Sequence, residues 1–363
     1  MSGSNETVRI GMVGAGGIVA QRHHPGLSKV DGVELVSVCN STPESSQRAA
    51  ATFSIPTTYA NWRDLVAADD TNAILIGTQP YLHRAITVAA LDAGKHVFCQ
   101  ARMAMDYQDA KRMYERALAS DRTTMLCPPP HYMRGDTVIR NLIRQGYVGP
   151  IYNVVIRSYL DSYSDASTPL HWRQIGRVSG VNTLDLGMMA EVLHRWLGYT
   201  QRVSAQTRTF VTERDSPAGN GRATVDRPDT VSVVAELENG ALATMLLSGM
   251  ARAATDRNAF EVYGANGALR YDFAADTIYG LPAGADEWQV IPVSDAEARP
   301  WSAEADWVEA IRTGQWGSPS FWDGLKYMEF TEAVVRSAET GRAQVLPFDA
   351  LEQPARARAA IGM

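Results

Sequence analysis

The first third of the chain alternates short apolar runs with longer amphipathic stretches. The apolar runs have the length of buried strands, and the stretches between them repeat their apolar positions with helical spacing. The runs are 8–13, 33–40, 73–77, 96–99 and 123–127. Strands that alternate with helices in this way indicate a parallel, doubly wound α/β sheet, which we place in residues 1–127.

Residues 128–363 follow a different pattern, in which apolar and polar residues alternate with a period of two. Such alternation is typical of strands with one buried and one exposed face. The expected strands are 151–161, 202–211, 230–237, 241–249, 259–264 and 267–272. The other expected features are hairpin links at 238–240 and 265–267, a long loop at 212–229, and helices at 137–145, 303–312 and 322–340. We therefore predict an α+β domain with an open, mostly antiparallel sheet.

Composition argues against several classes of partner. Acidic residues outnumber basic ones by 40 to 34, and a net charge of −6 argues against nucleic acid or an anionic membrane surface. No apolar run approaches the ~18 residues that cross a membrane, and the short polar N-terminus does not resemble a signal peptide. Three widely spaced cysteines suit reduced thiols and do not match a metal site. We expect a cytoplasmic protein without a bound metal.

A glycine-rich turn follows the first strand. Gly14 allows a tight turn, and Gly16 lets backbone N–H groups approach a pyrophosphate at the start of the next helix. The motif continues through Gly17 and Ile18, but its third position holds Val19 where glycine or alanine is usual. Because a second strand follows the predicted helix, the context supports a dinucleotide-binding site.

The end of the second strand bears on the choice of cofactor. An acidic residue there binds the adenosine ribose of NAD and repels the 2′-phosphate of NADP. This chain has the neutral residues Asn40, Ser41 and Thr42, which remove that repulsion, although no arginine follows immediately. The sequence therefore allows NAD or NADP, with a slight preference for NADP.

Further candidate cofactor residues lie near the ends of the other predicted strands. Thr78, Gln79 and Pro80 belong to the loop after one strand, His83 ends that loop, and Gln100 ends the next strand. Because ligands bind at the carboxyl ends of parallel strands, we expect these residues to border one crevice with the glycine turn. His83 has a second interpretation, as a core histidine that bridges helix and loop.

Three segments are similar to motifs of the Gfo/Idh/MocA oxidoreductases. Gly94–Arg102 resembles the family's Gly-Lys-His-Val-(apolar)-Cys-Glu-Lys-Pro strand, 78–83 its Thr-x-Pro-x-x-His loop, and 171–189 its Trp-Arg … Asp-x-Gly-x-His segment. The resemblance covers almost the whole chain. It implies a Rossmann domain, followed by a domain whose sheet backs the substrate pocket and forms the subunit contacts of a homodimer or homotetramer. It also implies NAD(P)-dependent oxidation or reduction of a sugar, glycoside, cyclitol or related polyol.

The two residues that usually handle the proton are absent. In the family a lysine beside the nicotinamide and a histidine that points at the substrate take this role, and here Ala101 and Met189 stand at those positions. Gln100 and Arg102 likewise replace the family's glutamate and proline. Two losses in one site suggest different chemistry or none, so the resemblance identifies an atypical member.

Other residues are candidates for the missing roles. A dehydrogenase needs a base within hydrogen-bond reach of the substrate hydroxyl, and His171 is the best candidate by type, although it is equally open to an ordinary loop role. Asp185 and Tyr159 are alternatives to His171 as the base. The candidate substrate-binding residues are Arg102, Trp172, Arg173, Arg157 and His131.

Three functions remain open from the sequence. The first is hydride transfer between a polyhydroxylated small molecule and NAD(P). The second is an enzyme with tightly held NAD whose net chemistry is not redox, such as elimination, glycoside cleavage or epimerisation. The third is a non-catalytic protein that binds the cofactor.

Overall fold

The computed structural model describes residues 7–127, 133–219, 221–255 and 257–355. They form two compact units. One contains 7–127 with 302–325 and 351–355, and the other contains 133–301 with 326–350, apart from the undescribed positions. The division differs from the sequence prediction, which assigned all of 128–363 to the second domain.

The segment around residue 307 explains this difference. Helix α9 (Ala303–Thr313) packs with α1 (His24–Leu27), and its Trp307 is fully buried with the ring centroid 5.4 Å from that of Phe98. Amphipathic spacing predicts such a helix but does not indicate which core receives its apolar face. The tertiary structure therefore assigns this helix to the first unit.

The first unit is built on a parallel sheet, as the sequence predicted, and the two-residue strand β3 joins the five predicted strands in the order β3-β2-β1-β4-β5-β6. The strands are β1 Val8–Val13, β2 Val33–Cys39, β3 Thr57–Thr58, β4 Ala73–Ile76, β5 His96–Cys99 and β6 Thr124–Leu126. The order reverses between β1 and β4, which is where a doubly wound sheet opens its ligand crevice.

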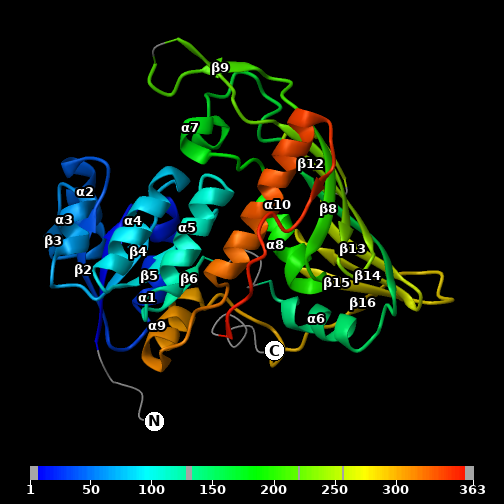
Figure 1. The fold of residues 1–363 in the computed structure, drawn as a ribbon, viewed down its shortest axis with the longest axis horizontal. Coiled ribbons are helices and arrows are strands. Elements are labelled where there is room, and N and C mark those ends of the chain that lie inside the picture. Colours follow the sequence, from blue (N-terminus) through cyan, green and yellow to red (C-terminus); the bar gives the residue numbers. More distant parts are fainter. Residues whose placement is uncertain (1–6, 128–132, 220, 256, 356–363) are drawn as a thin grey trace. The chain divides into compact units, whose positions relative to one another are not determined.

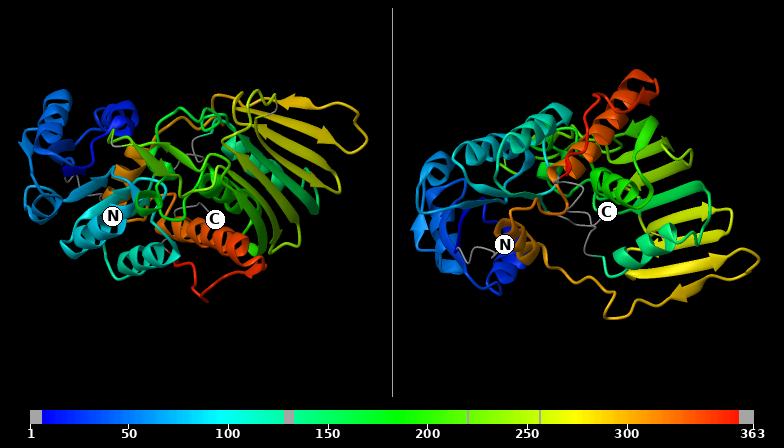
Figure 2. Two further views of the ribbon diagram at one scale, coloured as in Figure 1. Left: turned by 90° about the horizontal axis from the view of Figure 1, so that it is seen from above. Right: turned by 60° about the horizontal axis from the view of Figure 1, so that its bottom comes forward.

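Helices flank this sheet in two groups (Figures 1 and 2). A short π-helical turn at Val19–His23 leads into α1, which packs with α9, whereas α4 packs with both α3 and α5. The remaining bounds are α2 Pro43–Phe53, α3 Trp62–Ala67, α4 Pro80–Asp92 and α5 Tyr107–Leu118. The arrangement leaves the carboxyl ends of the strands to the connecting loops.

The second unit is built on a nine-stranded sheet with the order β16-β15-β14-β13-β7-β12-β11-β8-β17. All neighbours are antiparallel except β7 and β12, which are parallel, so the prediction of an open, mostly antiparallel sheet is confirmed. The strands are β7 Ile151–Tyr159, β8 Thr200–Arg208, β11 Thr230–Leu237, β12 Leu242–Ser248, β13 Asn258–Gly264, β14 Gly267–Asp272, β15 Thr277–Pro282, β16 Gln289–Ile291 and β17 Gln344–Val345.

The predicted long loop at 212–229 contains regular structure. Its two short strands, β9 (Glu213–Asp215) and β10 (Arg222–Thr224), form an antiparallel pair. These strands are mostly polar, so apolar alternation does not reveal them. The fully buried Arg214 donates from Nη1 to the carbonyl oxygens of Asp165 and Thr168 at 2.7 and 3.1 Å, and thereby ties this hairpin to the loop at 160–170.

Helices cover one face of the large sheet, as Figure 2 shows. They are α6 (Asp136–Arg144), α8 (Leu186–Leu197) and the 326–340 part of α10 (Phe321–Thr340). Residues of β7 alternate accordingly: Val154, Ile156 and Ser158 are buried on the helix side, whereas Arg157 is partly exposed. No described helix covers the opposite face.

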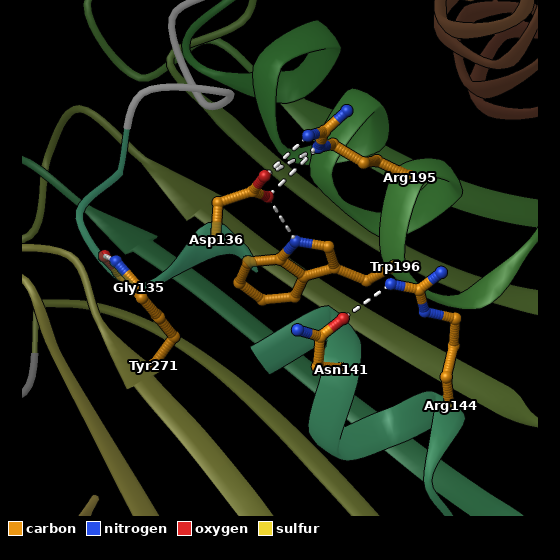
Figure 3. A network of polar contacts seen from close by, with 7 residues as sticks. All are labelled: Gly135, Asp136, Asn141, Arg144, Arg195, Trp196 and Tyr271. Carbon is orange, nitrogen blue, oxygen red and sulfur yellow. Dashed lines mark hydrogen bonds and ion pairs between the residues drawn. The ribbon is translucent and has the colours of Figure 1, made fainter. Parts of the chain in front are cut away.

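A buried polar network anchors α8 to α6 (Figure 3). Asp136 is fully buried and accepts from Arg195 Nη2 at 2.5 Å, from Arg195 Nε at 3.0 Å and from Trp196 Nε1 at 2.9 Å. The carboxylate thus has the several donors that a buried charge needs. The network fixes the C-terminal end of α8, whose opposite end carries Asp185.

Candidate functional site

The glycine turn after β1 has the geometry of a phosphate-binding loop. Gly14 has a φ of +87°, which favours glycine, and a Cβ there would lie 2.7 Å from the backbone nitrogen of Thr78. A Cβ on Gly16 or Gly17 would meet no atom within 4 Å. The backbone at these two residues therefore borders open space, as a bound pyrophosphate requires.

Val19 stands at the third glycine position of the motif, and the structure shows how it fits. Its side chain is fully buried. Opposite it lies Gly77, where a Cβ would come within 3.0 Å of Val19 Cγ2 and within 2.3 Å of the carbonyl oxygen of Gly14. The small residue that permits close packing is thus at the end of β4 instead of on the helix.

The side chains after β2 hold the loop together. Asn40 Oδ1 accepts from the N–H of Ala15 at 2.7 Å, and its Nδ2 donates to the carbonyl oxygen of Ser45 at 3.1 Å. Thr42 caps α2 by accepting from the N–H of Ser45. Ser41 is exposed. The structure thus gives Asn40 and Thr42 a framework role, which differs from the predicted contact with the ribose.

His83 is fully buried and bridges two loops. Its Nε2 lies 2.9 Å from the carbonyl oxygen of Thr78, and its Nδ1 lies 3.1 Å from those of Arg102 and Met103. Burial lowers the pKa of His83 more than these carbonyl oxygens raise it. The ring is therefore a structural link between loops, the second of the two interpretations, and not a residue exposed to a cofactor.

Thr78, Gln79 and Pro80 occupy the turn between β4 and α4. Gln79 is the N-cap residue of α4 without a side-chain capping bond, and Pro80 is the first helical residue, where its missing N–H costs nothing. The backbone nitrogen of Thr78 lies next to Gly14, as the Gly14 geometry shows. This turn and the glycine turn therefore meet at one edge of the sheet.

Gln100 ends β5 with a buried side chain. Its amide nitrogen is hydrogen-bonded to Nε2 of His23, whose Nδ1 lies 2.6 Å from Oε1 of Glu304. The following Ala101 carries no group that can exchange a proton, and the peptide bond between Ala101 and Arg102 is cis. Gln100 is thus bonded within the unit, in place of the predicted contact with the cofactor.

In the second unit, Asp185 immediately precedes α8. Its Oδ2 accepts from Ser158 Oγ on β7 at 3.0 Å. Leu184 before it has a φ of +45°, a conformation rare for residues with side chains and frequent at functional sites. Met189, one turn further on, is 1% exposed, and its thioether cannot replace an acid or base. Of the motif's aspartate and histidine positions, this chain therefore keeps a titratable side chain only at Asp185.

His171, Trp172 and Arg173 form a stacked group. The guanidinium carbon of Arg173 lies 4.2 Å from the Trp172 ring centroid, and the His171 ring centroid lies 5.6 Å from that of Trp172. His171 Nδ1 accepts from the N–H of Arg173 at 3.3 Å, so the neutral ring carries its proton on Nε2. Loss of hydration, and then the charge of Arg173, lower the pKa of His171. The resting ring is therefore a hydrogen-bond donor rather than a base.

The structure separates Arg157 and Tyr159 from the Asp185 side of β7. Alternation along the strand places both on the face opposite Ser158, which binds Asp185. Arg157 Nη2 forms an ion pair with Glu261 Oε1 at 2.7 Å on that open face. The arrangement gives no support to Arg157 as a substrate-binding residue or to Tyr159 as the base. His131 lies outside the described residues.

Tyr163 is a candidate that the sequence did not indicate. Its ring packs against Gly249, where a Cβ would lie 2.5 Å from Cδ2 of the ring. Burial raises the pKa of Tyr163, Arg173 then lowers it and Asp185 raises it, so the phenol is close enough to both charges to interact with them. The residue lies in the loop at 160–170, whose course depends on Arg214. No periodic pattern marks such a position.

Comparisons with known proteins agree with this geometry. Residues 8–126 match the model described as an oxidoreductase family with an NAD-binding Rossmann fold, and residues 137–270 match the Gfo/Idh/MocA C-terminal domain. The chain therefore belongs to the Gfo/Idh/MocA family, and its first unit is an NAD-binding Rossmann domain.

Two curated relatives span most of the chain. Levoglucosan dehydrogenase of Pseudarthrobacter phenanthrenivorans is 26% identical over 340 residues, covering 83% of this chain and 86% of that protein. Inositol 2-dehydrogenase 3 of Saccharopolyspora erythraea is 25% identical over 353 residues, covering 96% of this chain and 97% of that protein. Both are named as dehydrogenases of polyhydroxylated small molecules.

Solved structures share the fold. Levoglucosan dehydrogenase in its apo form has a TM-score of 0.87 at 21% identity and covers 94% of this chain and 99% of its own. An oxidoreductase domain protein from Kribbella flavida has a TM-score of 0.85 at 24% identity and covers 94% of this chain and 100% of its own.

In the part of the chain that the structure describes, no helix has the length and hydropathy to cross a membrane.

Proposed function

We propose that this protein is an NAD(P)-dependent oxidoreductase that transfers hydride between a polyhydroxylated small molecule and nicotinamide. The observation that carries the proposal is the glycine turn, where Gly14 closes against Thr78 while Gly16 and Gly17 border open space. A cyclitol, a sugar or an anhydrosugar is the substrate class, because relatives that span most of the chain are named for levoglucosan and inositol.

The second unit supplies the groups for substrate chemistry. A nicotinamide bound to the first unit would supply the acceptor or the donor of the hydride. The Asp185 carboxylate takes the proton of the substrate hydroxyl, and Ser158 holds that carboxylate through one oxygen. The N–H at Nε2 of His171 donates to a substrate oxygen, and Trp172 offers an apolar face to the sugar ring.

The cationic groups have a separate role in this proposal. Arg102 follows Ala101 directly, and Arg173 lies over Trp172. A guanidinium stays protonated, so neither group is a base. Both are suited to bind hydroxyl or carboxylate oxygens of the substrate, and Arg102 to stabilise an oxyanion.

We also propose that the protein accepts NADP as well as NAD. The end of β2 carries no carboxylate, and Asn40 is neutral and bonded to Ala15 and Ser45. A 2′-phosphate would therefore meet no negative charge from this strand end. Three free, buried cysteines are consistent with a reducing compartment such as the cytoplasm.

The open face of the large sheet supports self-association. Val234, Leu242 and Val290 are 53%, 51% and 60% exposed on β11, β12 and β16. Strands β11 and β12 are neighbours and β16 is an edge strand of the same sheet. Exposed apolar residues on this sheet favour burial against a second copy. We propose a homodimer or homotetramer through this face, and a monomer in light scattering at micromolar concentration would contradict it.

One experiment separates the candidate functions. The melting temperature of the purified protein is measured with and without NAD(H) or NADP(H). A separate sample is assayed at 340 nm with levoglucosan, myo-inositol and a uronic acid. A rise in the melting temperature and stoichiometric formation of NADH or NADPH are expected. Product formation without net absorbance change would favour the non-redox alternative. Absence of any cofactor-dependent shift would contradict the proposal.

A further inference from the structure

The segment at 100–103, which lacks the family's lysine, is held by two fully buried histidines. His83 reaches the carbonyl oxygens of Arg102 and Met103, and His23 is hydrogen-bonded to the side chain of Gln100. The segment is therefore held through its backbone at one end and through a side chain at the other. Neither histidine has exposed surface with which to meet a ligand.

The His23 connection continues to a carboxylate from the far end of the chain. His23 Nδ1 lies 2.6 Å from Oε1 of Glu304 on α9, and Glu304 is 2% exposed. The α1 helix approaches this carboxylate closely because residue 26 is glycine, where a Cβ would lie 2.3 Å from Oε2 of Glu304. The contact is thus built into the packing of α1 on α9.

Hydrogen-bond chemistry gives this chain of groups one direction. The Glu304 carboxylate accepts, so a neutral His23 ring donates from Nδ1 and leaves Nε2 as an acceptor. An amide nitrogen can donate to such an acceptor, and the amide nitrogen of Gln100 is the group that lies there. A carboxylate at residue 100 would meet an acceptor nitrogen instead. One carboxylate, one imidazole and one amide are therefore linked in this order.

The aromatic packing around His23 limits its movement. Its ring meets Phe98 on β5 edge-on at 5.1 Å, and Phe98 in turn packs against Trp307 on α9. Strand β5 and helix α9 therefore both contact the imidazole. A ring held in this way transmits the position of Glu304 to Gln100.

We propose that Glu304 and His23 are positioning residues that hold Gln100, and with it Ala101 and Arg102, at the carboxyl end of β5. The role in catalysis rests on the proposed function, because this strand end borders the predicted cofactor crevice. Neither residue acts on substrate directly. Their effect passes through the orientation of the segment at 100–103.

Exchanging the carboxylate and the amide tests this proposal. The variants are Glu304→Gln, Gln100→Glu and the double variant, in the full-length protein. Each single variant is expected to raise the Kd for NADH or NADPH and the KM for the oxidised cofactor about tenfold, a change of roughly 1.4 kcal/mol. The double variant restores one carboxylate and one amide, so both constants are expected to return to within about threefold of the wild-type values.

Glu309→Gln is the matched control, because Glu309 is exposed on the same helix. It is expected to leave both constants unchanged. If the double variant shows only the sum of the single effects, or if Glu304→Gln lowers the melting temperature while both constants stay at wild-type values, the proposal is overturned.

Hydrogen exchange separates failure of this proposal from failure of the proposed function. In each single variant, the backbone amides of residues 100–103 are expected to exchange faster, and the double variant is expected to restore their protection. This readout needs no cofactor. Unchanged exchange in both single variants would overturn the positioning role even if the protein proves to be a dehydrogenase.

Discussion

Polar side chains serve different purposes in the two units. In the first unit, the side chains of Asn40, His83 and Gln100 form hydrogen bonds with other groups of that unit. In the second unit, His171 and Arg173 are exposed around the half-buried Trp172. The first unit therefore leaves ligand contact mainly to backbone groups of its glycine turn, whereas the second offers side chains. The alanine at position 101 therefore leaves the backbone contacts of the glycine turn in place.

The largest effect is expected for Asp185→Asn. If the carboxylate takes the substrate proton, kcat falls by about 10²- to 10⁴-fold. An asparagine oxygen still accepts from Ser158, so the melting temperature is expected to change little. Steady-state kinetics and thermal unfolding of the same preparation measure both quantities.

His171→Asn is the partner variant for that test. Asparagine keeps an acceptor for the N–H of Arg173 and is a favourable N-cap residue. We expect a loss of about tenfold in kcat/KM, as for one hydrogen bond to substrate. A larger loss for this variant than for Asp185→Asn would reverse the assignment of the base.

Gly14→Ala tests the backbone part of the comparison. The positive φ and the contact with Thr78 are expected to lower the free energy of unfolding by about 1–3 kcal/mol and to weaken cofactor binding. Gly17→Ala is the control, because a Cβ there meets no protein atom within 4 Å. This variant should leave the free energy of unfolding unchanged. It should weaken cofactor binding if the bound cofactor lies against the glycine turn. Chemical denaturation and fluorescence titration with NADH report the two effects.

A smaller effect is expected for Asn40→Asp. The aspartate can still accept from Ala15 but loses the donor to the carbonyl oxygen of Ser45, a cost that applies to both cofactors and cancels in their ratio. Its negative charge now faces a 2′-phosphate. The ratio of Kd values for NADPH and NADH should rise about tenfold, which corresponds to roughly 1.4 kcal/mol. Asn61→Asp, a change at the N-cap of α3, is the control and should leave the ratio unaltered. An unchanged ratio in Asn40→Asp would place the ribose elsewhere.

The smallest effect is expected for His194, which lies near the C-terminal end of α8, the helix that Asp185 precedes. Burial, and then the charge of Lys326, lower the pKa of His194 to about 3. The unfolded chain takes up this proton near pH ~6.5, before the folded protein does, so the free energy of unfolding falls as the pH decreases from ~6.5 toward 3. The stability contributed by the neutral ring is complete above that window.

Melting temperatures at several pH values between 7 and 4 check this expectation. The slope in His194→Gln should be shallower than in the wild type, whatever the change in absolute stability. Parallel curves for the two proteins would show that His194 does not titrate as its burial implies.

Much of the fold follows from local patterns in the sequence. Buried runs predict the strands of the parallel sheet, and the asparagine-glycine links at 238–240 and 265–267 predict hairpins that the structure contains. Strands β3, β15, β16 and β17 are missing from that prediction, and so is the β9–β10 pair. Short strands at a sheet edge or in a polar hairpin have too few buried positions to show a period.

The residues of the candidate site also fall into two groups, those that a local motif reveals and those that only tertiary contacts place. The glycine turn and Asp185 belong to motifs with fixed spacing, so they are recognisable along the chain. The partner of Arg157 could not be predicted, because Glu261 lies on a strand about a hundred residues further along the chain. Tyr163 and Glu304 had no local signal, since each owes its place to residues distant in sequence, such as Gly249 and His23.

The sequence by itself determined the two kinds of sheet, the glycine turn and the absence of the usual lysine and histidine, because periodicity and residue type are local properties. Only the tertiary structure decided that Gln100, His83 and Asn40 bond within their own unit, that Glu304 reaches His23, and that His171 holds its proton on Nε2. The physical reason is that a hydrogen bond depends on where its partner lies. For most of these side chains the partner belongs to another strand, loop or helix. For His171 the partner is the nearby N–H of Arg173, which the local course of the backbone brings within reach.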